Sequence, residues 1–260
     1  MSVAQIGQSV RRTEDQRFVT GKGRYVDDIG RPGQAHAFFL RSPHAHARIR
    51  RIDLHEAQHA PGVVAVLTGD DLAADKIGGL ICGWMIHSKD GSPMKAGPHP
   101  ALAQGKVRYV GDHVAVVIAE TLAEAKDAAE KIVVDYEVLP AAVDPAKTQA
   151  KGAAQVHDEA PNNTVFNWHL GDKAATDAAF AKASHVTTID LVNNRLVANA
   201  MEPRAAVGDY DSGTDNFTLY TTSQNPHVAR LVLSAFIGIA PENKLRVIAP
   251  DVGGGFGSKI

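Results

Sequence analysis

The 260-residue sequence has a single cysteine, Cys82. One thiol cannot form an internal disulfide, and an iron–sulfur cluster needs about four cysteine ligands, so the chain cannot hold such a cluster by itself. So little cysteine is most simply explained by a reducing compartment. The run Gly79–Trp84 around Cys82 is apolar, which predicts a small buried thiol rather than a nucleophile.

Net charge and long apolar runs are also lacking. The formal charge is -2, which gives no basic surface of the kind that binds nucleic acid. No run approaches the roughly 18 apolar residues of a membrane span, and the first residues have no signal-peptide core. Although there are 12 histidines, the spacing of those between residues 36 and 59 fits no zinc pattern. We therefore expect a cytoplasmic chain with no nucleic-acid partner, membrane span or metal ligands of its own.

What is present is a hydrophobic content of 44%, enough for a core. Residues 1–19 are polar and basic and predict an extended arm. Residues 20–140 predict an α/β domain, in which Ala37–Leu40 and Val63–Leu67 read as strands. Residues 76–104 are rich in glycine, proline and histidine and predict a long surface loop.

The strongest local pattern lies between residues 107 and 138. Val107–Val110 predicts a short strand, and Val114–Ala119 is apolar throughout, as in a strand buried on both faces. Thr121, with a glutamate three residues on, is a capping box that starts a helix. Val133–Val138 predicts the strand that returns from it. A strand, a capped helix and a strand indicate α/β layering.

Residues 141–154 read as a linker, and residues 155–260 as a second region of mixed α/β type. We predict a helix at about 174–183. Strands are expected near residues 185–192, 203–210, 217–222 and 245–249.

Two loops of the second region carry candidate site residues. Gln224 comes just before Asn225 and Pro226, a good N-cap followed by a favoured first helical residue. Free backbone N–H groups gather at such a helix start and favour anionic or oxo ligands. Spacing by itself leaves open whether Gln224 binds a ligand or only sits in a turn.

The second loop is the glycine-rich stretch Gly253–Gly257. It fails as a phosphate loop, because Ser258 precedes Lys259, and it fits the dinucleotide fingerprint only in part. Backbone with so few side chains can approach a large ligand closely, with Phe256 as the one bulky group. A glycine-rich hairpin without a ligand remains the alternative.

Several segments, in order along the chain, resemble the large, molybdenum-binding subunit of the molybdenum hydroxylases, which include xanthine dehydrogenase, aldehyde oxidase and aerobic carbon monoxide dehydrogenase. Those segments are "GKGRYVDDI", "RSPHAHARI", "PGVVAVLTGDDL" with "VRYVGDHVAVVIAET", "MEPRAAVGDYD", "TTSQNPH" and "DVGGGFGSK". The basic arm looks most like carbon monoxide dehydrogenase-type members. The resemblance implies a hammerhead-type α/β domain at 20–140 and the first part of a molybdopterin-binding domain at 155–260.

The resemblance also implies site residues and partners. Gly255, Phe256 and Gly257 would lie against a molybdenum-molybdopterin cofactor in its cytosine dinucleotide form, and Gln224 would hydrogen-bond an oxo ligand. The implied reaction is oxidative hydroxylation of a small-molecule substrate, with water as the oxygen donor. FAD on a medium subunit and a 2Fe–2S cluster on a small subunit would carry the electrons away.

The sequence departs from the family in two ways. Family large subunits are far longer and carry their catalytic glutamate near the C-terminal end, so no residue here takes that role. The chain is therefore expected to be the first third of a large subunit and inactive by itself. Purine-oxidising members carry a glutamate where Ile260 stands, which leaves carbon monoxide, aldehydes or N-heterocycles. A non-catalytic interaction module of the same family, or an unrelated nucleotide-binding α/β protein, are the alternatives.

Overall fold

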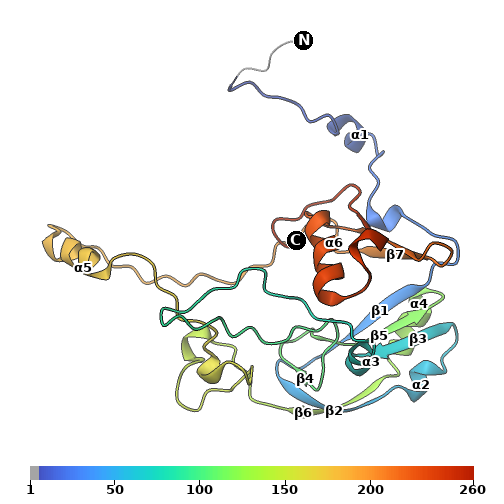
Figure 1. Cartoon of the computed structure of the whole chain (residues 1–260), viewed down its shortest axis with the longest axis horizontal. Coiled ribbons are helices and arrows are strands. Elements are labelled where there is room, and N and C mark those ends of the chain that lie inside the picture. The colour runs from blue at the N-terminus through green and yellow to red at the C-terminus, as the bar shows by residue number, and fades with distance from the viewer. Residues whose placement is uncertain (1–5) are drawn as a thin grey trace. The chain divides into compact units, whose positions relative to one another are not determined.

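The computed structural model describes residues 6–260, so the first five residues of the expected arm lie outside the described residues (Figure 1). The chain divides into two compact units. One contains residues 33–196 and 236–239, and we call it the hammerhead unit. The other contains the residues up to Pro32, with 197–235 and 240–260, and we call it the loop unit.

The first sheet of the hammerhead unit has the order β1-β5-β3, with both pairs antiparallel. These strands are β1 (His36–Arg41), β5 (His113–Ala119) and β3 (Val63–Thr68). The central strand β5 is buried on both faces, as its apolar run predicts. Helix α4 (Leu122–Ala129) follows it and begins at the predicted capping box, in which Thr121 Oγ1 accepts from Glu124 N at 3.2 Å.

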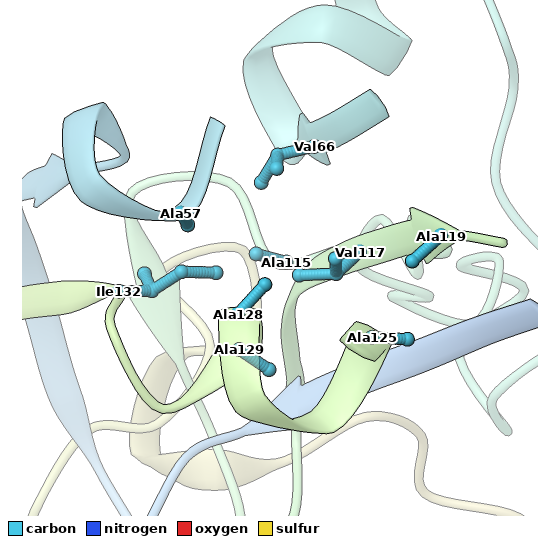
Figure 2. Close-up of a cluster of buried hydrophobic side chains, with 9 residues drawn as sticks. All are labelled: Ala57, Val66, Ala115, Val117, Ala119, Ala125, Ala128, Ala129 and Ile132. Atoms are coloured by element: carbon cyan, nitrogen blue, oxygen red, sulfur yellow. The ribbon is translucent and has the colours of Figure 1, made fainter. Parts of the chain in front are cut away.

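Small side chains let α4 pack closely on this sheet. Figure 2 shows the cluster, in which the helix contributes Ala125, Ala128 and Ala129 and β5 contributes every second residue. Alternate side chains of a strand point to opposite faces, so Ala115, Val117 and Ala119 face the helix. Val114 faces the other way, into a second cluster with Ala47, Ala103 and Val107. Side chains of β5 therefore contribute to two separate hydrophobic clusters, one on each face of the strand.

The second sheet has the order β4-β2-β6, again antiparallel. Its strands are β4 (Lys106–Val107), β2 (Ala47–Asp53) and β6 (Val133–Val138). The sequence reading missed β2, a partly exposed strand in which two adjacent arginines interrupt the alternation of polar and apolar residues. The strand predicted at 133–138 is present as β6. It pairs with β2 in this second sheet and not with β5, so α4 connects strands of different sheets.

The loop unit has the sheet β7-β8-β9, with β7 (Ala206–Asp211), β8 (Asn216–Thr221) and β9 (Leu245–Ile248). Strands β7 and β8 form an antiparallel hairpin, whereas β8 and β9 are parallel. Helix α6 (Pro226–Val232) connects the parallel pair and passes into a π-helical turn, Leu233–Ile237. Gly238 follows with φ of +82°, a left-handed conformation that commonly ends a helix.

The other helices are α1 (Asp15–Val19), α2 (His55–Gln58), α3 (Gly69–Ala74), α5 (Lys173–Lys182) and the 3₁₀ turns Val26–Asp28, Pro145–Lys147, Pro161–Asn163 and Glu242–Lys244. The fully extended arm is therefore wrong for residues 15–19. No helix among the described residues is long and apolar enough to cross a membrane.

Two further predictions were wrong. The thiol of Cys82 is exposed, because its apolar neighbours lie in the long loop at 76–104 and not in a core. Residues 185–192 are extended but form no strand, since nothing in the described part of the chain pairs with them.

Candidate functional site

The two candidate loops leave the same edge of the loop-unit sheet. Because β8 and β9 are parallel, with Tyr220 beside Ile248, their carboxyl ends lie together. Gln224 follows the first strand and Gly253–Gly257 follows the second. Ligands of open α/β sheets commonly bind outside the carboxyl ends of the strands, so this is a favoured position for a site.

Gln224 joins the two loops through three hydrogen bonds. Its backbone N–H donates to the carbonyl of Lys259 at 2.8 Å. Its side-chain Oε1 accepts from Gly257 N at 2.9 Å and from Lys259 N at 3.3 Å. Both donors are backbone N–H groups, so this side-chain atom must be the amide oxygen. The amide nitrogen Nε2 makes no hydrogen bond within the described residues and is free to donate.

The start of α6 is arranged differently from the expected cap. Asn225 makes no side-chain cap bond, and its own N–H donates to Ser223 Oγ at 3.0 Å. Pro226 takes the first helical position, as predicted. The polar groups before the helix therefore fix the turn, while Gln224 itself remains exposed.

Glycine is required in the loop mainly by the protein's own packing. A Cβ on Gly255 would lie 2.3 Å from Cδ of Gln224, and one on Gly253 would lie 2.5 Å from Cβ of Glu202. Gly254 and Gly257 have positive φ, which a side chain would strain. Close approach of a ligand is therefore not the only reason for the glycines, since two of them make room for neighbouring residues.

The loop still presents free polar groups. The backbone N–H groups of Gly254, Gly255 and Phe256 donate to no acceptor in the described part of the chain. Phe256 has φ of +52°, and the residue is 77% exposed. Successive free amides in a turn with positive φ angles form a concave donor surface of the kind that binds anions.

A buried ion pair closes the loop, and the sequence reading did not single it out. Lys259 Nζ donates to the carbonyl of Glu202 at 2.7 Å and to its Oε2 at 3.2 Å, with the lysine side chain only 2% exposed. The same Oε2 accepts from Gly253 N at 2.7 Å. Glu202 Oε1 is buried and has no partner within the described residues. The sequence could have pointed to this pair, because Glu202 lies in "MEPRAAVGDYD" and Lys259 in "DVGGGFGSK", two of the segments that carry the family resemblance.

Asp251 anchors the start of the loop to the N-terminal residues. Its carboxylate is held by both terminal nitrogens of Arg17, with Nη2 2.7 Å from Oδ1, and by Arg24 N at 2.7 Å. The Arg17 hydrogen bond, followed by that from Arg24, lowers the pKa of Asp251 to about 2. The same bond to Asp251 raises the pKa of Arg17. The loop therefore begins and ends at charged anchors.

A cavity of about 250 Å³ lies elsewhere, in the hammerhead unit, between residues 97–100, Lys106, Arg108 and His157. Burial, and then the charge of Arg108, lower the pKa of His157. Lys106 is paired with Asp158 at 3.1 Å. Charges of both signs thus meet at this cavity, and we assign no ligand to it.

Among the described residues, no group of three or more histidine, cysteine or acidic side chains could hold a metal ion. A cofactor at the loop site would therefore be held by backbone amides and amide side chains. These are hydrogen-bond donors suited to oxygen-rich groups.

Two family models match the sequence. Residues 20–140 match the aldehyde oxidase and xanthine dehydrogenase a/b hammerhead domain, and residues 156–260 match the molybdopterin cofactor-binding domain. These matches exclude the alternative of an unrelated nucleotide-binding protein.

Among curated proteins, the carbon monoxide dehydrogenase large chain of Afipia carboxidovorans is 40% identical over 98% of this chain and 32% of its own length. The nicotine 6-hydroxylase large subunit of Paenarthrobacter nicotinovorans is 38% identical over 98% of this chain and 30% of its own. The crystal structure of quinoline 2-oxidoreductase from Pseudomonas putida 86 superposes with a TM-score of 0.87 at 39% identity, over 98% of this chain and 31% of that one. The chain thus spans about a third of the length of these relatives.

Proposed function

The chain belongs to the family of molybdenum hydroxylase large subunits that includes carbon monoxide dehydrogenase and xanthine dehydrogenase, and it corresponds to their N-terminal part; on this premise we propose that its two loops form one wall of a molybdopterin pocket. Gln224, Gly255, Phe256 and Gly257 are the proposed cofactor-binding residues. The observation that carries the proposal is the free Nε2 of Gln224, whose Oε1 is already engaged by two backbone N–H groups.

The free groups of the site fit such a cofactor. Molybdopterin is rich in oxygen and nitrogen acceptors and carries a phosphate, so it needs several hydrogen-bond donors. The loop offers the unengaged amides of residues 254–256, and Gln224 offers one more donor beside them. Phe256 is exposed and positioned by backbone at positive φ, and it would pack against a planar ring.

When bound, the cofactor supplies the two-electron oxidation of a substrate carbon, with water as the oxygen source. The residues of this chain bind and orient it. Gln224 donates a hydrogen bond from Nε2 to an oxygen acceptor and at the same time holds Gly257 and Lys259 in place. No residue of this chain is proposed as the catalytic base, which we place in the part of the large subunit outside these 260 residues.

We propose that the electrons leave through redox groups outside these 260 residues, because a single cysteine cannot bind an iron–sulfur cluster. We propose a cytoplasmic complex in which a small subunit carries 2Fe–2S clusters and a medium subunit carries FAD. We also propose the cytosine dinucleotide form of the cofactor.

Carbon monoxide dehydrogenase-like oxidation is the first candidate for the reaction. Hydroxylation of an aromatic N-heterocycle is the second, because nicotine 6-hydroxylase is 38% and quinoline 2-oxidoreductase 39% identical, against 40% for the carbon monoxide dehydrogenase large chain. The test is to isolate the complex through a tag on this chain and to measure reduction of an artificial electron acceptor. Carbon monoxide, an aldehyde, nicotine and quinoline are the substrates to compare.

Gln224→Glu is the discriminating variant. A glutamate keeps an oxygen that accepts from Gly257 N and Lys259 N, so the loop should stay in place. It removes the Nε2 donor, and loss of one such donor lowers turnover by about 100-fold or more. Thermal unfolding of the chain and the molybdenum and pterin content of the complex should be measured beside turnover.

The control is Gln224→Met, which removes both the acceptor and the donor and should also loosen the loop. The proposal fails if complexes that contain the wild-type chain hold neither molybdenum nor pterin. It also fails if Gln224→Glu turns over substrate at the wild-type rate.

A further inference from the structure

The stretch that follows helix α5 has no partner. From Phe166 to Asn199 every residue is exposed. We call residues 184–196 of this stretch the 184–196 segment. It contains no helix or strand, and none of its backbone N–H or carbonyl groups takes part in a backbone hydrogen bond within the described chain.

The composition of this segment is that of a strand. Five of the seven residues in 186–192 are β-branched, which favours extended, paired backbone. Large apolar side chains stand in solvent: Ile189 is 72% exposed, Leu191 78%, Val192 89% and Leu196 87%. Monomeric proteins rarely expose so many neighbouring apolar side chains unless the surface binds something.

Residues 165–167, which precede helix α5, do form backbone hydrogen bonds with another segment of the chain. The carbonyl of Val165 accepts from Lys95 N at 3.0 Å, and that of Asn167 accepts from Lys89 N at 2.8 Å. Extended backbone in the same connection is therefore paired as soon as another segment lies beside it. The 184–196 segment differs in lacking such a neighbour, not in its capacity to pair.

We propose that the 184–196 segment is a β-strand that pairs with an exposed strand edge in the part of the large subunit outside these 260 residues. The choice of partner rests on length. The matches take in 98% of this chain but only 31% of quinoline 2-oxidoreductase and 32% of the carbon monoxide dehydrogenase large chain, so about two thirds of each relative lie outside the matched part. Main-chain hydrogen bonds would give the affinity, and the apolar side chains would be covered by the added sheet.

This inference rests on family membership and not on the pterin site. The segment makes no contact with Gln224 or Gly255 in any hydrogen bond of the described residues. The two proposals can therefore fail separately.

The experiment uses the complex isolated from the native host through a tag on this chain. A photo-reactive benzoylphenylalanine replaces Leu191, and the cross-linked peptide is identified by mass spectrometry. We expect it to come from large-subunit sequence outside these 260 residues. A cross-link to a second copy of this chain, or to the flavin or iron–sulfur subunit, would overturn the inference.

Hydrogen exchange gives a second readout. In the isolated chain the amides of the 184–196 segment should exchange as in an unfolded peptide, whereas in the complex they should exchange about tenfold slower or more. Equal rates in the two samples would overturn the inference.

Proline variants test whether the contact is strand pairing. Ile189→Pro and Asp190→Pro remove N–H groups that point to opposite sides of a strand, so at least one should reduce recovery of the complex by about tenfold or more. Ile189→Val keeps the N–H and should assemble normally. Neither proline should change urea denaturation of the isolated chain, because the segment is exposed there. If neither proline affects assembly, or if the isolated chain is destabilised, strand pairing is wrong.

Gln224→Glu separates this inference from the proposed function. That variant should lose turnover and keep the Leu191 cross-link. Loss of the cross-link in Gln224→Glu would show that the segment depends on the pterin site, and would overturn the independence argued here.

Discussion

Lys259→Met should be among the most destabilising single changes in the loop unit. The lysine side chain is 2% exposed and that of Glu202 is 13% exposed, with Nζ 3.2 Å from Oε2. Removing one partner of a buried ion pair leaves an uncompensated charge and costs about 3–5 kcal/mol. The carboxylate also has no compensating bond at Oε1. Urea denaturation of the wild-type and variant chains measures the change in the free energy of unfolding.

Two further variants make this prediction refutable. Lys173→Met is the matched surface control, because Lys173 and Asp177 are 77% and 62% exposed, and such pairs contribute about 0.5 kcal/mol or less. Adding Glu202→Gln to Lys259→Met should recover most of the loss, since the amide oxygen can still accept from Gly253 N without carrying a charge. A loss below about 1 kcal/mol for Lys259→Met, or a double variant no more stable than the single one, would refute the reasoning.

Two other predictions follow from the caps and anchors. The pKa of Asp251 is about 2 in the folded chain, below its ordinary value, so the link to Arg17 should stabilise the fold above about pH 4 and lose this effect as the pH falls toward 2. Asp251→Asn should show a flatter stability curve in that window by thermal unfolding, and a curve identical to the wild type would contradict the assignment. Thr121→Ala should cost about 1 kcal/mol, because Thr121 caps α4, whereas Asn225→Ala should cost less, since Asn225 makes no side-chain cap; equal losses in urea denaturation would argue against the capping box.

Much of the fold could be predicted from local patterns. Val114–Ala119 is apolar throughout and is buried on both faces in the structure, because an apolar run of that length has no polar side to show to water. Thr121 and Glu124 fixed the start of α4 through bonds only three residues apart. Such features depend on near neighbours, and the sequence displays near neighbours directly.

The order of the quoted motifs also indicated the family without any structure, because each motif is local and their succession is specific. It placed Gln224 and Gly255–Gly257 as candidates, and the structure brings these loops together at the parallel ends of β8 and β9. Whether they bind a cofactor stays a prediction.

Only the tertiary structure decided contacts between distant residues. Val133–Val138 joins β2 and not β5, because pairing depends on which strand edge is free and not on composition. Glu202 meets Lys259 across 57 positions, and Arg17 meets Asp251 across 234, so no periodicity could reveal either pair. The exposed 184–196 segment shows the converse. Its sequence has the propensity of a strand, but a strand forms only where another backbone offers hydrogen bonds, and the described chain offers none there.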